Sequence, residues 1–111
     1  MYDYLSIYSP GYSKTIRTEV LEEYLKFFLN FNKESSLRFS KIHSGELIRV
    51  TGILANSKGN YAFNSLDGIE EINLIEIDIP ENINDELEKT ILNIAKSIAK
   101  EYSWLIDLGG I

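Results

Sequence analysis

Carboxylate pairs are the side chains of this sequence that come closest to a chemical motif. Glu70 and Glu71 are adjacent, and Glu76 and Asp78 stand two residues apart in a run that alternates apolar and polar residues. Residues two apart in a β-strand point to the same side, so Glu76 and Asp78 share one strand face. Like charges that close can shift a pKa or bind a divalent cation. An acidic strand face that prevents aggregation is the simpler interpretation, because the sequence has no Asp-x-Asp-x-Asp-Gly calcium loop.

The other residues that could do chemistry do not form a catalytic pattern. His43 is the single histidine of the chain, and its place in a turn with Ser44 and Gly45 predicts a solvated loop residue. The absence of cysteine removes disulfides, thiolate metal sites and cysteine nucleophiles. No serine stands in a Gly-x-Ser-x-Gly elbow, and no phosphate-binding glycine motif occurs. We therefore expect a protein that is not an enzyme and has no cofactor or metal.

The formal charge of −6 is concentrated in one part of the chain. Residues 69–88, the acidic segment, contain eight acidic and no basic side chains, so the segment carries −8 and the remainder +2. Nucleic-acid binding needs a basic surface that neutralises phosphates, so we expect no nucleic-acid partner. A local negative surface can instead steer a cationic protein partner. The candidate contact residues of the acidic segment are Glu70, Glu71, Glu76, Asp78, Glu81 and Asp85.

Length and composition indicate a single domain that spans residues 1–111. With 44% hydrophobic and 25% charged residues, a chain of 111 residues can bury one core without cross-links. The first residues lack the basic and apolar regions typical of a signal peptide, and no apolar run approaches the ~20 residues that a bilayer crossing needs. The sequence thus predicts a soluble, cytoplasmic protein with no membrane partner.

Hydrophobic periodicity predicts two helices and six strands. The first helix is expected to start at Thr18 as N-cap and to stop near Asn30; the second is capped by Asn84 or Asp85 and extends to Tyr102. The apolar positions of the first helix are Val20, Leu21, Tyr24, Leu25 and Phe28, and those of the second are Leu87, Ile91, Ile94, Ala95, Ile98, Ala99 and Tyr102. The strands are expected at residues 3–8, 37–42, 47–54, 61–63, 71–79 and 104–108.

The resulting order, β-α-β-β-β-β-α-β, predicts an α+β fold. Two amphipathic helices cannot bury their apolar faces alone, and a largely antiparallel sheet offers one apolar face to both. We therefore expect a two-layer sandwich with two helices on one face of the sheet and an open face opposite. Alternation along the strands places Tyr4, Tyr8 and Arg38 on the open face with Glu76 and Asp78. Tyrosine and arginine are typical of interface hot spots, although tyrosine also serves in cross-strand packing.

The last third of the chain has a recognisable layout. An acidic strand at 72–80 is followed by a short polar loop, by a helix that ends with residues 94–101 and by the run from Trp104 to Asp107. This layout resembles small bacterial immunity proteins of contact-dependent or polymorphic toxin systems, and related bacterial families. The resemblance implies a cytoplasmic, non-enzymatic inhibitor that binds a cognate toxin, and the acidity suits a basic nuclease. Two alternatives remain open: a small ligand-binding or enzymatic α+β domain, and an acidic inhibitor that mimics nucleic acid.

Overall fold

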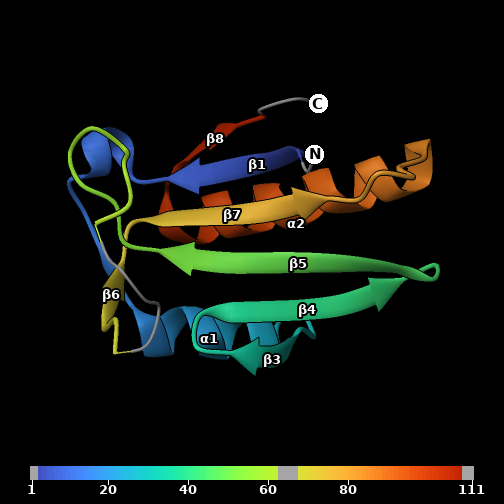
Figure 1. Ribbon diagram of the computed structural model, residues 1–111, viewed down its shortest axis with the longest axis horizontal. Helices are drawn as coiled ribbons and strands as arrows, with labels where there is room; N and C mark the ends of the chain where they lie inside the picture. The colour runs from blue at the N-terminus through green and yellow to red at the C-terminus, as the bar shows by residue number, and fades with distance from the viewer. Residues whose placement is uncertain (1–2, 63–67, 109–111) are drawn as a thin grey trace.

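A six-stranded antiparallel sheet carries two helices on one of its faces (Figure 1). This computed structural model describes residues 3–62 and 68–108. The α+β, two-layer architecture is the one that the sequence predicts. The strands are β1 (Asp3–Tyr8), β2 (Ile16–Arg17), β3 (Asn32–Ser35), β4 (Arg38–His43), β5 (Glu46–Ile53), β6 (Glu71–Ile72), β7 (Leu74–Ile79) and β8 (Leu105–Asp107), and the helices are α1 (Thr18–Phe27) and α2 (Asp85–Tyr102).

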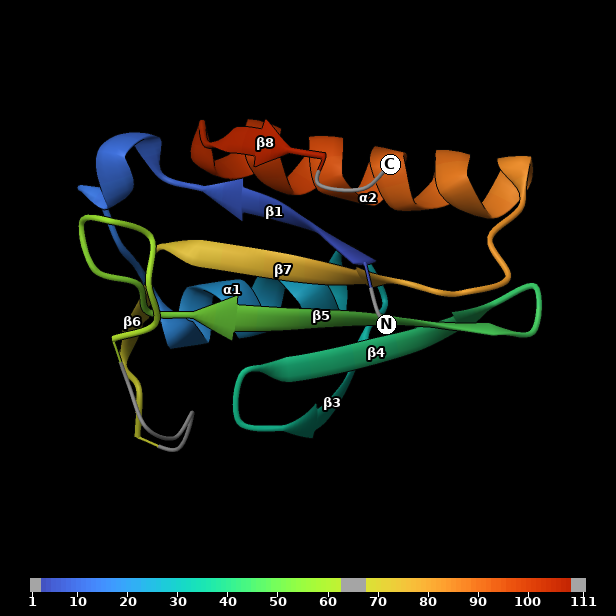
Figure 2. The same cartoon turned by 45° about the horizontal axis from the view of Figure 1, so that its top comes forward.

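The strand order of the main sheet is β3-β4-β5-β7-β1-β8, and every neighbouring pair is antiparallel. β2 and β6 form a separate two-stranded sheet. Because β7 and β8 both pair with β1, the β7-α2-β8 connection passes over the helix side of β1. The tilted view keeps α1 and α2 on the same side of the sheet (Figure 2). The opposite side of the sheet is therefore the open face that the sequence predicts.

Strand register fixes which side chains belong to each face. Leu5 of β1 and Val50 of β5 both stand opposite Ile77 of β7, and all three are fully buried on the helix side. The residues between them point the other way: Tyr4 stands opposite Asp78, and Glu76 lies between Ser6 and Thr51. Arg38 faces Thr51 on the same side. The predicted open-face positions Tyr4, Tyr8, Arg38, Glu76 and Asp78 are therefore confirmed.

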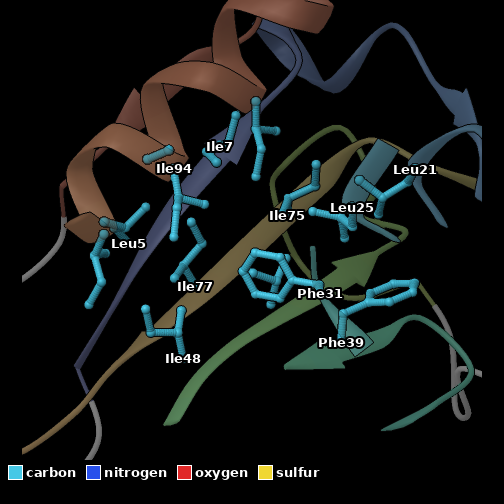
Figure 3. Packing of buried hydrophobic residues seen from close by; sticks show 14 of the residues in the cluster. Leu5, Ile7, Leu21, Leu25, Phe31, Phe39, Ile48, Ile75, Ile77 and Ile94 are labelled. Atoms are coloured by element: carbon cyan, nitrogen blue, oxygen red, sulfur yellow. The ribbon is translucent and has the colours of Figure 1, made fainter. Parts of the chain in front are cut away.

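The main core lies between the helices and the sheet (Figure 3). The predicted apolar positions of α2 from Leu87 to Ala99 are buried, whereas α1 buries only Leu21 and Leu25 among its own residues. The prediction that Val20 and Phe28 are buried is wrong, because their side chains are 45% and 75% exposed. Phe28 occupies the C-cap position, where the chain leaves the helix. Phe31 turns into the core beyond the helix end and fills that part of it.

Four local predictions need correction. Thr18 is the first helical residue rather than the N-cap, and its hydroxyl donates to the Ile69 carbonyl at 2.7 Å instead of capping the helix. The short strands β2 and β3 were not predicted. The predicted strand 71–79 is interrupted at Asn73, which separates β6 from β7. In place of the predicted strand 61–63, Tyr61 forms an isolated bridge with Ala55, and Phe63 lies outside the described residues.

Asn84 is the N-cap of α2, in agreement with one of the two predicted alternatives. Its Oδ1 accepts a hydrogen bond from the Leu87 amide at 2.8 Å, and acidic side chains follow in the first helical turn. We expect Asn84→Ala to lower the free energy of unfolding by about 1 kcal/mol, because the Leu87 amide loses its acceptor. Urea denaturation measures this loss. Asn84→Ser, which keeps an acceptor oxygen, should recover most of it, and equal losses in the two variants would contradict the capping role.

Candidate functional site

The open face is covered at one end by two segments. The loop 54–62, which follows β5, lies beside the 3-10 turn Pro10–Tyr12, which follows β1 (Figures 1 and 2). Beneath them a second cluster of Ile53, Ala55 and Leu74 packs against Tyr8 and Tyr12, whose rings stack with centroids 5.4 Å apart. The sequence did not predict this small core. The second cluster and the two segments above it make this end of the open face stand higher, and we call it the raised end. The described residues leave the rest of that face uncovered.

A hollow of about 340 Å³ lies against this raised end. It is lined by Arg38, Arg49, Thr51 and Ile53 of β4 and β5, by Glu76 and Asp78 of β7, and by Tyr61 of the loop. A volume of that size is near the lower end of the range for small-molecule pockets. The hollow therefore brings two guanidinium groups, two carboxylates and a phenol to one place.

Tyr61 fixes one of the two carboxylates. Its hydroxyl donates to Oε1 of Glu76 at 2.9 Å. Burial raises the pKa of Tyr61 to about 12, and the hydrogen bond and the charge of Glu76 contribute to that shift. Burial likewise raises the pKa of Glu76, against the hydrogen bond from Tyr61, which lowers it. The Glu76 carboxylate is thus a desolvated acceptor held in place by a phenol.

The second carboxylate lies between the arginines. Burial raises the pKa of Asp78, and the charges of Arg49 and Arg38 oppose that shift. Arg49 also forms a forked ion pair with Glu34: its Nε donates to Oε2 at 2.9 Å and its Nη2 to Oε1 at 3.3 Å. That pair lowers the pKa of Glu34. Because Arg49 pairs with Glu34, its positive charge is divided between the carboxylates of Glu34 and Asp78.

A second hollow of about 290 Å³ continues past Asp78 towards the end of β7. Arg49 and Asp78 line both hollows, so the two adjoin. The second adds Leu47 and Glu46 of the β4–β5 hairpin, Pro80, and the carboxylate of Glu81. Glu46 pairs with His43, so its side chain belongs to the helix side of the sheet. We call the two hollows together the β7 groove. It follows β7 along the open face, from Tyr61 at one end to Glu81 at the other.

The acidic segment does not form one surface. Glu76, Asp78 and Glu81 line the β7 groove. Glu70 and Glu71 lie at β6, at the opposite end of the molecule from the loop that joins β7 to α2 (Figure 1). Asp85 is in the first turn of α2, where a negative charge is favourable to the helix dipole. An acidic nucleic-acid mimic needs its charges along one surface, and these positions do not provide that arrangement.

The tyrosines and Arg38 of the predicted site have different surroundings. Tyr4 is 47% exposed beside Asp78, on the part of the face that the loop leaves open. Tyr8 is half-buried against the second cluster, so it serves in packing, as the sequence analysis considered for tyrosine. Arg38 lines the groove. Tyr4 and Arg38 therefore remain candidates for contact with a partner, whereas Tyr8 supports the raised end.

The sequence did not point to two polar residues that line the groove, Arg49 and Tyr61, or to Glu34, which pairs with Arg49. Arg49 stands between buried Ile48 and Val50, so the alternation of its strand already placed it on the open face. Glu34 belongs to β3, a strand without apolar residues that periodicity cannot detect. Tyr61 reaches Glu76 through a loop. No short-range pattern predicts a contact of that kind.

The prediction that His43 is a solvated loop residue is wrong. His43 is the last residue of β4 and faces the helix side of the sheet. Its Nε2 lies 3.2 Å from the hydroxyl of Thr90 and 3.6 Å from Oε1 of Glu86, both on α2. This contact ties the hairpin to the second helix. No nucleophile–base pair with an orienting third group is formed there by the described residues.

The described part of the chain contains no group of three or more His, Cys, Asp or Glu side chains placed to hold a metal ion. Within the same residues, neither helix is long and apolar enough to cross a membrane. Comparison of the chain with family models, with characterised proteins and with solved structures finds no match. The geometry and charge of the open face are therefore the features of this chain that bear on its function.

The raised pKa of Glu76 gives a testable pH dependence. A carboxyl whose folded-state pKa lies above its unfolded value contributes stability that is fully present below the unfolded pKa and is lost as pH rises through the folded pKa. Glu76→Gln keeps an oxygen acceptor for Tyr61 without the charge. We expect the variant to become more stable relative to the wild type as pH rises from 4 to 7, measured by urea denaturation. The exposed control Glu70→Gln should show no such trend, and parallel curves for Glu76→Gln and the wild type would contradict the burial effect.

Proposed function

We propose that the protein is a non-enzymatic inhibitor of the immunity type, which binds a toxin domain through its open sheet face. The observation that carries this proposal is the β7 groove, which joins arginine, carboxylate and tyrosine groups on a sheet face that the described residues leave uncovered. Tyrosine and arginine are residue types enriched at the centre of protein interfaces. The net charge of −6 favours a basic partner.

The surface next to the groove supports protein binding over the capture of a small molecule alone. Ile42 and Leu47 form a cross-strand pair on the open face and are 73% and 43% exposed. With Tyr4 on the other side of Asp78, they place apolar surface on either side of the charged centre. Apolar side chains beside a charged groove can be covered by a macromolecule but not by a ligand that only fills the groove.

Sequencing of the flanking genes, followed by co-expression with a toxin domain that they encode, tests the proposal. We expect the two proteins to co-purify and the toxin to lose its effect on growth. Thr51→Trp places a large side chain in the first hollow, at a strand position that tolerates aromatic residues. It is expected to weaken binding roughly thirtyfold or more, as the loss of a hot spot does.

Asn93→Trp is the matched control, because Asn93 is exposed on α2, on the opposite side of the molecule. This variant should bind as the wild type does. If neither co-purification nor protection is found with the neighbouring toxin, the inhibitor proposal is wrong. If Thr51→Trp binds at full strength, the partner uses another surface.

A small-ligand site in the first hollow is a second candidate function. It is favoured by the volume of about 340 Å³ and by two half-buried carboxyls whose pKa values are raised by burial beside two arginines. Ligand-observed NMR with a panel of guanidinium compounds, polyamines and organic acids tests it. Saturable binding that Thr51→Trp removes supports this function, and a panel without binders contradicts it.

A further inference from the structure

The β7 groove carries an excess of negative charge. Its lining contributes two guanidinium groups, from Arg38 and Arg49, and three carboxylates, from Glu76, Asp78 and Glu81. Glu34 binds Arg49 through both oxygens, so part of the positive charge is already used. Glu76 and Asp78 are half-buried, and burial raises the pKa of each. An added cation would therefore relieve two desolvated carboxylates.

The spacing of those carboxylates matches an extended chain. Glu76 and Asp78 are alternate residues of β7 on the open face, each paired across β1 with an open-face residue. Alternate residues of a strand are about 6.6 Å apart and point to the same side. An extended peptide that lies along the groove repeats the same distance between its own alternate side chains. Two basic residues separated by one position can thus meet Glu76 and Asp78 together, whereas two adjacent basic residues cannot.

We infer that the β7 groove binds an extended segment of the partner protein in which arginine or lysine occupies alternate positions. The inference rests on the proposed function, because it names the part of the partner that the open face recognises. Glu76 and Asp78 receive the two cations, and Glu81 attracts the segment at the far end of the groove. Tyr61, which donates to Glu76, closes the other end.

Arginine in the groove raises the opposite possibility, that an acidic segment binds. Arg38 makes no side-chain hydrogen bond to the residues that the structure describes, and its charge acts on both Asp78 and Glu34. Three lining carboxylates face two guanidinium groups, and Glu34 already pairs with one of these, Arg49, so the charge balance favours a cationic occupant. An acidic peptide bound at Arg38 is accordingly an outcome that the experiment must be able to detect.

Titration of the whole chain with three blocked peptides separates these cases. The probes are Ser-Arg-Thr-Arg-Ser, with basic residues at alternate positions, Ser-Arg-Arg-Thr-Ser, with the same composition but adjacent arginines, and Ser-Glu-Thr-Glu-Ser. Amide chemical shifts report binding at Thr51, Glu76 and Asp78. We expect the alternating basic peptide to bind roughly fivefold more tightly than the adjacent one, the worth of one ion pair. Added salt should weaken the binding.

A charge-matched pair of variants provides the control. Glu76→Gln combined with Asp78→Asn should lower the affinity for the alternating basic peptide by about tenfold or more, as the loss of two ion pairs implies. Glu70→Gln combined with Asp85→Asn removes the same charge outside the groove and should change binding by less than about twofold, because exposed distant charges are screened. Equal affinity for the two basic peptides, preference for the acidic peptide, or an equal effect of the two double variants would overturn the inference.

The outcome for the neighbouring toxin distinguishes this inference from the proposed function. If Thr51→Trp blocks the toxin but Glu76→Gln with Asp78→Asn does not, the open face binds a partner and the assignment of a basic segment is wrong. If the alternating peptide binds the groove and the toxin binds neither wild type nor variant, the groove recognises a basic segment and the inhibitor proposal is wrong.

Discussion

Phe39→Ala is expected to lower the free energy of unfolding by about 4 kcal/mol, whereas Phe28→Ala is expected to change it by less than about 0.5 kcal/mol. Both substitutions remove the same atoms. Phe39 is fully buried in the main core, where its ring lies near Phe31 and Leu25 (Figure 3), and Phe28 is 75% exposed. The buried ring loses its transfer free energy and leaves a cavity that the surrounding sheet and helix cannot fill.

Urea denaturation of the two variants measures this difference. A domain of this size has a total stability of about 5 to 15 kcal/mol, so Phe39→Ala removes a large part of it. With an urea m-value of about 1 to 3 kcal/mol/M, the midpoint should fall by more than about 1 M. Circular dichroism before denaturation shows whether the variant folds. Similar losses for the two variants would mean that Phe28 is buried as the helical spacing alone predicts.

The contrast between these phenylalanines illustrates what periodicity can and cannot predict. α2 has eighteen residues, and its apolar positions repeat over five turns, so the pattern identified both the helix and its buried face. α1 has ten residues and ends one position before Phe28. A pattern this short does not indicate where a helix stops, and the last apolar residue can leave the buried face together with the helical geometry. The burial of Phe31 depends on that stop.

The candidate site was predictable to the extent that it depends on strand alternation. Glu76 and Asp78 were placed on one strand face, and that face is the open one. Local periodicity does not determine the order of strands across the sheet, so the proximity of Arg38 and Arg49 to Asp78 could not be predicted. The contact between Tyr61 and Glu76 depends on a loop whose position is fixed by a buried asparagine. Polar residues that hold loops carry no periodic signal.

That asparagine is Asn73, and we expect its replacement to lower the free energy of unfolding strongly. Asn73 is 3% exposed. Its Oδ1 accepts from the Ala55 amide at 2.8 Å, and its Nδ2 donates to the carbonyls of Ala55 and Tyr12 at 2.9 and 3.2 Å. Asn73→Ala leaves these backbone groups without partners and is expected to cost about 3 kcal/mol of unfolding free energy. Asn93→Ala, an exposed change on α2, should cost less than about 0.5 kcal/mol.

Asn73→Asp separates the polar contribution from the loss of packing. The aspartate keeps the shape and an acceptor for the Ala55 amide, but an ionised carboxylate has no donor for the carbonyls of Ala55 and Tyr12. We expect this variant to be destabilised at pH 7 and to recover part of the loss as pH falls and the carboxyl becomes a donor. Because the same hydrogen bonds hold the loop that carries Tyr61, the chemical shifts of Glu76 should change with them. A variant as stable as the wild type at pH 7, with Glu76 unchanged, would mean that the loop is held by the apolar contacts of Ile53, Ala55 and Leu74 alone.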